Sequence, residues 1–153
     1  MAIWYRVHHD KNEKNVFSGD GGLYVAGRWS FKGTKAIYCS QSIALATLEW
    51  LCHNGLSVSE FDYFRYSIEV PENLIIKPSK LKLPKEWNFT PATDEARIFA
   101  TKEFISVGKF LGMIVPSVMV PEENNLIINP LHPKFNNIAS SIKRLGFFKA
   151  PTR

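Results

Sequence analysis

The first forty residues contain short stretches in which apolar and polar side chains alternate, a pattern typical of half-buried strands. We expect a first strand over residues 3–8, followed by a polar loop whose glycines permit tight turns. Two further strands are predicted over residues 24–29 and 35–39, with a glycine turn between them. The amino-terminal part of the chain is therefore predicted to be rich in β-structure.

The period of the pattern changes after residue 40, where good helix formers follow one another up to Gly55. Ser40 is the predicted N-cap, and Gly55 is the predicted stop. At 100° per residue the apolar side chains between them cover nearly the whole circumference, which predicts a buried helix. Glu49 is the one carboxylate on this helix.

The rest of the chain alternates between predicted strands and predicted helices, with a proline-bearing surface loop over residues 77–92. Many short strands with a few helices indicate an α+β fold, a compact mixed sheet in one domain that spans residues 1–153. The predicted strands are 61–70, 73–76, 111–120 and 126–129, and the predicted helices are 93–107 and 135–145.

The composition predicts a single hydrophobic core, and the cysteines predict a protein of a reducing compartment. The chain has 153 residues, of which 45% are hydrophobic, and this length suits a single domain. Its two cysteines, Cys39 and Cys52, lie in apolar surroundings that favour buried, reduced thiols over a disulfide framework. Because the sequence shows neither a leader pattern nor a long apolar run, we expect a cytoplasmic protein that does not contact a membrane.

The basic charge changes this picture little. Nineteen Lys and Arg residues against fourteen Asp and Glu residues give a net charge of +5, which would attract nucleic acid, an acidic protein or a phosphorylated small molecule. The basic residues are scattered in ones and twos, which favours an ordinary solvated surface over a nucleic-acid footprint. We therefore expect no direct nucleic-acid binding by this chain.

Glu49 is the first candidate for chemistry, because a carboxylate on a buried helix must find cationic or hydrogen-bonding partners. Such carboxylates are frequent at active sites. Two structural alternatives stay open at this point: Glu49 reaches solvent at a gap in the packing, or it pairs with His53 one turn further on.

Two arginines lie among apolar residues near the glycine-rich loop. Arg28 is flanked by Gly27, which permits close backbone approach, and by Trp29, a large apolar anchor. Together with Arg6 in the first strand it resembles a phosphate clamp, since the guanidinium fork suits two phosphate oxygens. The alternative is an arginine stem that covers apolar surface. Tyr38 ends a strand before the Glu49 helix, where its ring would stack on a base or simply fill the core.

The remaining candidates are few. Ser117 is the only polar side chain between Met113 and Val120, and its alternative role is a hydroxyl bonded to nearby backbone. The histidines and cysteines show no metal-ligand spacing, and no nucleophile motif, P-loop or dinucleotide-binding glycine pattern is present. The sequence predicts no metal and no cofactor.

Five motifs in order, taken together, resemble the RES-domain family: YRV near the start, GG-x(4)-GRW-x(3)-G, YCS, ALATLE and PSVMVPEENNLIINPLHPKF. The resemblance spans almost the whole chain. It implies a bacterial toxin with an ADP-ribosyltransferase-like fold that acts on NAD as its substrate. It also implies a protein partner, an Xre-type helix-turn-helix antitoxin that covers the active site.

Carried over by motif, the resemblance makes Arg28, Tyr38 and Glu49 the central site residues, with Arg6 and Ser117 lining the same pocket. The implied reaction cleaves the bond between nicotinamide and ribose, as a glycohydrolase or a phosphorylase. The alternatives are transfer of ADP-ribose to a protein, an RNase toxin, and a non-enzymatic module that only binds a nucleotide.

Two neighbours of Arg28 complete the predicted substrate-binding set. Trp29 is expected to fix the guanidinium in place. Ser30 stands where the family often has Asn, and its hydroxyl retains one of the hydrogen bonds that an amide makes.

Overall fold

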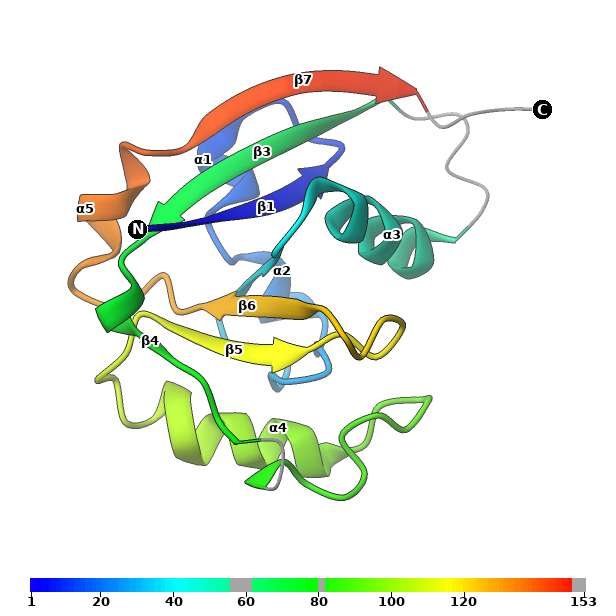
Figure 1. Cartoon of the computed structure of the whole chain (residues 1–153), viewed down its shortest axis with the longest axis vertical. Helices are drawn as coiled ribbons and strands as arrows, with labels where there is room; N and C mark the ends of the chain where they lie inside the picture. Colours follow the sequence, from blue (N-terminus) through cyan, green and yellow to red (C-terminus); the bar gives the residue numbers. More distant parts are fainter. Residues whose placement is uncertain (56–61, 80–81, 150–153) are drawn as a thin grey trace.

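The computed structural model describes residues 1–55, 62–79 and 82–149, and it contains one seven-stranded sheet in the order β4-β5-β6-β2-β1-β3-β7 (Figure 1). The β4–β5 pair is parallel and the other pairs are antiparallel, so the sheet is mixed. The strands are β1 (Ala2–His8), β2 (Ile37–Ser40), β3 (Asp62–Val70), β4 (Ile75–Ile76), β5 (Gly112–Pro116), β6 (Asn124–Ile128) and β7 (Lys143–Lys149).

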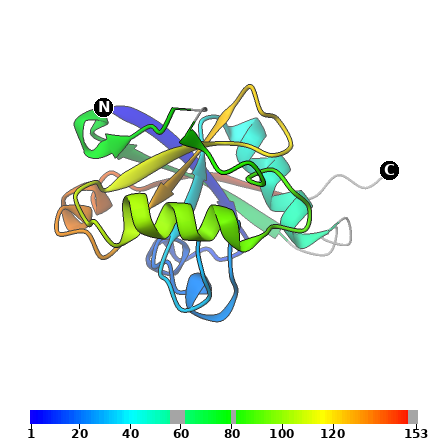
Figure 2. The same cartoon turned by 90° about the horizontal axis from the view of Figure 1, so that it is seen from below.

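Helices cover both faces of this sheet, which confirms the predicted α+β class. The short helices α1 and α5 pack on one face, while α3 and α4 lie apart from each other on the other face, each packed against different strands (Figures 1 and 2). The helices are α1 (Glu13–Val16), α2 (Gly21–Tyr24), α3 (Ile43–Asn54), α4 (Asp94–Ala100) and α5 (Phe135–Ala139), with a 3-10 turn η2 (Glu72–Leu74) and a π-helical turn η4 (Thr101–Ile105) that extends α4.

Strand register decides which side chains meet on each face, because successive residues of a strand point to opposite sides. Tyr38 pairs with Ile127, and Ser40 pairs with Asn125, so these four residues share the face that carries α3 and α4. Cys39 and Leu126 point the other way, into the core under α1 and α5. The polar side chains of β2 and β6 are thereby brought to the strip of sheet between the two larger helices.

The helix that follows β2 differs from its prediction in two respects. Its N-cap is Ser42, whose hydroxyl accepts a hydrogen bond from the Leu45 amide at 3.0 Å, whereas Ser40 is the last residue of β2. The prediction of a helix buried on all sides is also wrong, since only Leu45, Ala46 and Trp50 are buried and the other side faces solvent. The sheet on one side of α3 is enough to bury one stripe, and nothing within the described residues covers the opposite stripe.

Three further predictions are corrected by the structure. Residues 24–29 are not a strand: α2 ends at Tyr24, and an irregular loop follows, closed by an isolated bridge between Gly27 and Ser30. The helix predicted over 135–145 ends at Ala139, and β7 takes the chain onward as a strand beside β3. The strand predicted over 111–120 ends at Pro116. In the last part of the 135–145 segment the apolar run fits either a helix or a strand by periodicity, and pairing with β3 makes it a strand.

The other predicted elements are present with shifted ends. Strands 3–8, 35–39, 73–76 and 126–129 correspond to β1, β2, β4 and β6, and helix 93–107 corresponds to α4 with η4. The strand predicted over 61–70 corresponds to β3, although residue 61 lies outside the described residues. Cys39 is buried as expected, but Cys52 is exposed on the open side of α3. Among the described residues we find no helix with the length and apolar character of a membrane span.

Candidate active site

Glu49 projects from α3 towards β6 and the turn after β5, where two neutral donors bond one of its carboxylate oxygens. The Ser117 hydroxyl donates to Oε1 at 2.9 Å, and the Asn125 side-chain amide donates to the same oxygen at 2.6 Å. Within the described residues, Oε2 accepts no hydrogen bond and no cation forms an ion pair with Glu49. The carboxylate is therefore fixed in orientation while its charge is not neutralised. It is half-buried, and it does not pair with His53.

Asn125 was not among the predicted site residues, yet it links Glu49 to the sheet. Its Oδ1 accepts a hydrogen bond from the Ser40 hydroxyl at 2.7 Å, opposite to the amide nitrogen that bonds Glu49. The predicted strand begins one residue later, at position 126, so Asn125 lies just outside it. Ile127 lies on the same face of the sheet as Tyr38. A predicted strand that included Asn125 would, by alternation, have placed its side chain on that face as well.

Ser117 combines the two roles considered from the sequence. Its side chain is fully buried, and its hydroxyl accepts a hydrogen bond from the Val120 amide at 3.2 Å while donating to Glu49. The Ser117 amide donates in turn to the Glu123 carbonyl at 2.9 Å. The serine thus both closes the turn after β5 and orients the carboxylate.

Arg28 is held at the rim of this region by the backbone of the loop before α4. Its Nη1 donates to the carbonyls of Trp87 at 3.1 Å and Phe89 at 2.6 Å. Burial lowers the pKa of Arg28, and the nearby Glu49 carboxylate acts in the opposite direction and raises it. Nε and Nη2 make no hydrogen bond to a described residue, which leaves two donors of the fork for an anionic ligand.

The loop that carries Arg28 is packed tightly against the Tyr38 ring. The Tyr38 hydroxyl is 2.7 Å from the Ser30 hydroxyl and accepts a longer hydrogen bond from the Trp29 amide at 3.3 Å. A side chain at Gly27 would overlap the Tyr38 hydroxyl and approach the Ser30 Oγ to 2.8 Å, so only glycine fits there. Burial raises the pKa of Tyr38, whereas its bonds to Ser30 and Trp29 lower it.

Trp29 and Ser30 support this loop from inside the protein. They are 3% and 1% exposed, and the Trp29 ring stacks near Trp87 with centroids 6.3 Å apart. Arg97 of α4 adds a second support that the sequence reading missed, because its Nε donates to the Gly27 carbonyl at 2.8 Å. A lone arginine on an amphipathic helix carries no sequence signal for such a contact.

Arg6 is the predicted site residue that the fold places apart from Glu49. Strand alternation puts it on the face that carries Trp4 and Cys39, beneath α1. Its Nε donates to the Val16 carbonyl at 3.0 Å and its Nη1 donates to the Tyr38 carbonyl at 2.7 Å. Because β1 and β2 pair only at Tyr5 and Ser40, the guanidinium bridges the two strands where they separate. Burial lowers the pKa of Arg6.

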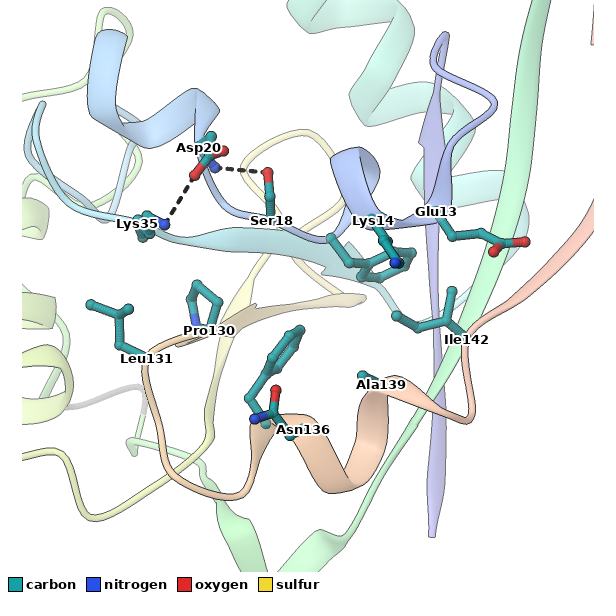
Figure 3. A pocket seen from close by; sticks show the side chains of 12 residues that line it. Glu13, Lys14, Ser18, Asp20, Lys35, Pro130, Leu131, Asn136, Ala139 and Ile142 are labelled. Carbon is teal, nitrogen blue, oxygen red and sulfur yellow. Dashed lines mark hydrogen bonds and ion pairs between the residues drawn. The ribbon is translucent and has the colours of Figure 1, made fainter.

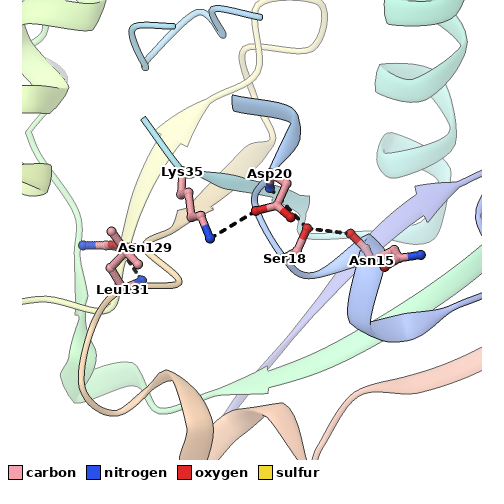
Figure 4. Close-up of polar contacts among 6 residues, drawn as sticks. All are labelled: Asn15, Ser18, Asp20, Lys35, Asn129 and Leu131. Atoms are coloured by element: carbon pink, nitrogen blue, oxygen red, sulfur yellow. Dashed lines mark hydrogen bonds and ion pairs between the residues drawn. The ribbon is translucent and has the colours of Figure 1, made fainter. Parts of the chain in front are cut away.

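A cavity of about 520 Å³ lies on that other side of the molecule, between α1 and α5 (Figure 3). Phe17, Pro130 and Phe135 contribute apolar surface to it. At its edge Lys35 pairs with Asp20 at 3.1 Å, and the Ser18 hydroxyl accepts from the Asp20 amide and donates to the Asn15 carbonyl (Figure 4). Its charged lining residues include this ion pair together with Glu13 and Lys14, so both signs of charge are present.

No group of three or more potential metal ligands occurs among the residues that the structure describes. The chemistry available at the candidate site is therefore described by a fixed carboxylate, an arginine fork and an aromatic ring. These are groups that stabilise a developing positive charge, bind phosphate oxygens and pack on a planar ring.

Comparison with known proteins agrees with this fold. The family model described as the RES domain matches residues 3–147, so the chain belongs to the RES-domain family. A Toxin Res of Photorhabdus laumondii is 36% identical over 145 residues, which cover 95% of this chain and 92% of the relative. A Toxin Res of Yersinia enterocolitica is 35% identical over 145 residues, covering 94% and 93%.

A third relative is named for its chemistry. The Prs ADP-ribosylating toxin of a Sphingobium species is 34% identical over 129 residues, which cover 82% of this chain and 80% of the relative. Over most of its length the chain is thus homologous to bacterial proteins named as toxins.

Proposed function

We propose that this protein is a cytoplasmic toxin enzyme that consumes NAD, with residues 1–153 forming one catalytic domain. The observation that carries the proposal is the Glu49 carboxylate, which is fixed through Oε1 by Ser117 and Asn125 and forms no ion pair within the described residues. A fixed, unneutralised carboxylate suits a reaction in which positive charge develops on a sugar. The names of the relatives support a toxin activity.

The proposed reaction breaks the bond between the nicotinamide nitrogen and C1′ of the ribose. The bonding electrons move to the pyridinium nitrogen, so nicotinamide leaves as a neutral ring and the sugar acquires oxocarbenium character. Glu49 would stabilise that charge and accept a hydrogen bond from a ribose hydroxyl through Oε2. Water or phosphate then adds to C1′, and the attacking water releases its proton to solvent.

The other predicted residues have complementary roles in this proposal. The free donors of Arg28 would bind the pyrophosphate, and the Tyr38 ring would pack against the nicotinamide end, since its hydroxyl is already bonded to Ser30. Because neutral nicotinamide is a good leaving group, neither a metal nor a cofactor is required, and NAD enters only as substrate.

Transfer of ADP-ribose to a protein side chain is a second candidate, favoured by the relative named as an ADP-ribosylating toxin. It uses the same bond cleavage with a different acceptor. We also propose that an Xre-type helix-turn-helix antitoxin covers the site. Co-expression of that antitoxin is expected to prevent loss of cellular NAD.

The decisive experiment incubates the purified protein with NAD, with and without phosphate, and separates the products by chromatography. We expect the products nicotinamide and ADP-ribose. When phosphate is the acceptor, we expect nicotinamide and the phosphate ester of ADP-ribose. Glu49→Gln should slow the reaction by about 100-fold or more. Persistence of NAD with a folded wild type would exclude the proposal, and loss of RNA with NAD unchanged would favour the RNase alternative. If NAD labelled in its ADP-ribose part leaves the label on a protein, the reaction is transfer of ADP-ribose to that protein.

A further inference from the structure

The Glu49 carboxylate reaches the sheet through a three-member chain of side chains. The Ser40 hydroxyl donates to Asn125 Oδ1 at 2.7 Å, and Asn125 Nδ2 donates to Glu49 Oε1 at 2.6 Å. An ionised carboxylate accepts but does not donate, so the amide nitrogen must face Glu49 and the amide oxygen must face Ser40. The orientation of Asn125 is therefore determined at both ends.

This arrangement makes the two oxygens of Glu49 different. Oε1 receives both donors, from Ser117 and Asn125, whereas Oε2 receives none among the described residues. A helix side chain with three rotatable bonds would otherwise sample several rotamers and present either oxygen. The two donors come from separate segments, the turn after β5 and the strand β6, so together they restrict both the position and the rotation of the carboxylate.

We propose that Asn125 is a positioning residue that fixes Glu49 so that Oε2 alone faces the bound ribose. The inference rests on the proposed function and adds a residue to it. Asn125 does not contact the substrate in this scheme. It acts on the reaction through Glu49, by keeping the carboxylate in the geometry that the transition state needs.

The test compares Asn125→Asp with Asn124→Asp, the same change one position earlier on β6, where the side chain points to the other face. At pH 8 an ionised carboxyl at position 125 would repel Glu49, and we expect kcat to fall by about tenfold or more. Towards pH 5 the introduced carboxyl gains a proton, because a like charge beside it disfavours ionisation, and it then donates to Oε1 as the amide does.

The expected result is a kcat ratio of Asn125→Asp to wild type that rises as the pH falls from 8 to 5, while the Asn124→Asp ratio stays level. Asn125→Ala has no donor and should stay slow at every pH, with KM for NAD changed less than kcat. The other titratable groups on the surrounding elements are present in all four proteins, and the Asn124→Asp ratio controls for the effect of one added carboxylate on β6: His53 on α3, Tyr38 on β2, Glu123 before β6, Arg28 in its loop and Arg97 on α4. A level ratio for Asn125→Asp would overturn the inference.

A second measurement separates this inference from the proposed function. The carbon-13 resonance of the Glu49 carboxyl should move in Asn125→Ala and stay in place in Asn124→Ala, whether or not the protein consumes NAD. An unmoved resonance in Asn125→Ala contradicts the positioning role. If the resonance moves in Asn125→Ala but the wild type leaves NAD intact, the proposed function is excluded, while the contact between Asn125 and Glu49 is supported.

Discussion

Two carboxylates, Glu49 and Asp20, lie in different surroundings in this molecule. Asp20 sits at the edge of the cavity between α1 and α5 and is paired with the Lys35 ammonium at 3.1 Å. Glu49 sits between α3 and the sheet and is held by a hydroxyl and an amide. The charge of Asp20 is balanced by the Lys35 ammonium, whereas the two groups that bond Glu49 are neutral. The comparison shows that neutral donors can orient an acidic group and leave its charge for a ligand.

The largest expected difference lies between removal of the two charges. Glu49→Gln should lower NAD consumption by about 100-fold or more, whereas Asp20→Asn should leave it within about twofold. Side chains of both Asp20 and Lys35 are well exposed, so the lost ion pair should change stability by about 1 kcal/mol or less. Activity and thermal unfolding of both variants test the comparison, which is refuted if Asp20→Asn is as slow as Glu49→Gln.

The next difference concerns packing around the two sites. Gly27→Ala places a methyl group against the Tyr38 and Ser30 hydroxyls, so the loop must shift and carry Arg28 with it. We expect activity to fall between about tenfold and about 100-fold. Gly21→Ala, the matched control beside Asp20, adds the same methyl group where nothing lies within 4 Å. Steady-state kinetics of Gly27→Ala and Gly21→Ala test this difference. Equal activities of the two variants would show that the Arg28 loop tolerates displacement.

A smaller difference is expected between two serines that play similar local roles. The hydroxyl of Ser117 accepts from the Val120 amide at 3.2 Å, and that of Ser18 accepts from the Asp20 amide at 3.2 Å. Only Ser117 also donates to Glu49. Ser117→Ala should therefore lower kcat/KM by about tenfold, and Ser18→Ala should not lower it. If both variants lose activity equally, the turn rather than the Glu49 contact matters.

The smallest expected effect lies outside both sites and concerns the stability of the fold in acid. Burial, reinforced by the charges of Arg6 and His9, lowers the pKa of His8 to about 4. Because the unfolded chain then binds more protons below pH 6.5, stability is complete above that pH and declines as pH falls towards 4. The neutral ring accepts a hydrogen bond from the Asp10 amide at 3.0 Å.

His8→Asn retains an acceptor at this position without the titration, so its melting temperature should fall less between pH 7 and pH 5 than that of the wild type. Thermal unfolding of both proteins across this range measures the difference. Parallel curves would mean that the loss of stability in acid arises elsewhere, and the two carboxylates would then need to be tested in the same way.

Much of the fold was predictable, because long alternating or periodic segments such as β1, β3 and α4 carry their own pattern. The errors fall where an apolar run lacked that information. Residues 143–149 contain apolar residues that fit either a helix or a strand, and pairing with β3 makes them a strand. Residues 25–29 have strand-like composition, yet the backbone hydrogen bond from Gly27 to the Ser30 carbonyl closes a loop instead.

The candidate site was predictable in part. Glu49 was singled out because we expected a helix with no exposed side; that premise is wrong, but the carboxylate is indeed held by hydrogen-bonding partners. Asn125 and Arg97 were missed because their contacts join segments that are 76 and 70 residues apart in the chain. Such contacts leave no local signal in a single sequence.

The sequence by itself determined the family of this chain, its class of fold and the residue types available for chemistry, since motifs and periodicity are local properties. The tertiary structure decided which of those residues meet. Register placed Arg6 on one face of the sheet and Asn125, Tyr38 and Ser40 on the other, and α3 then brought Glu49 over Asn125. The physical reason is that a strand alternates its faces residue by residue, so only the pairing of distant strands assigns each side chain to a site.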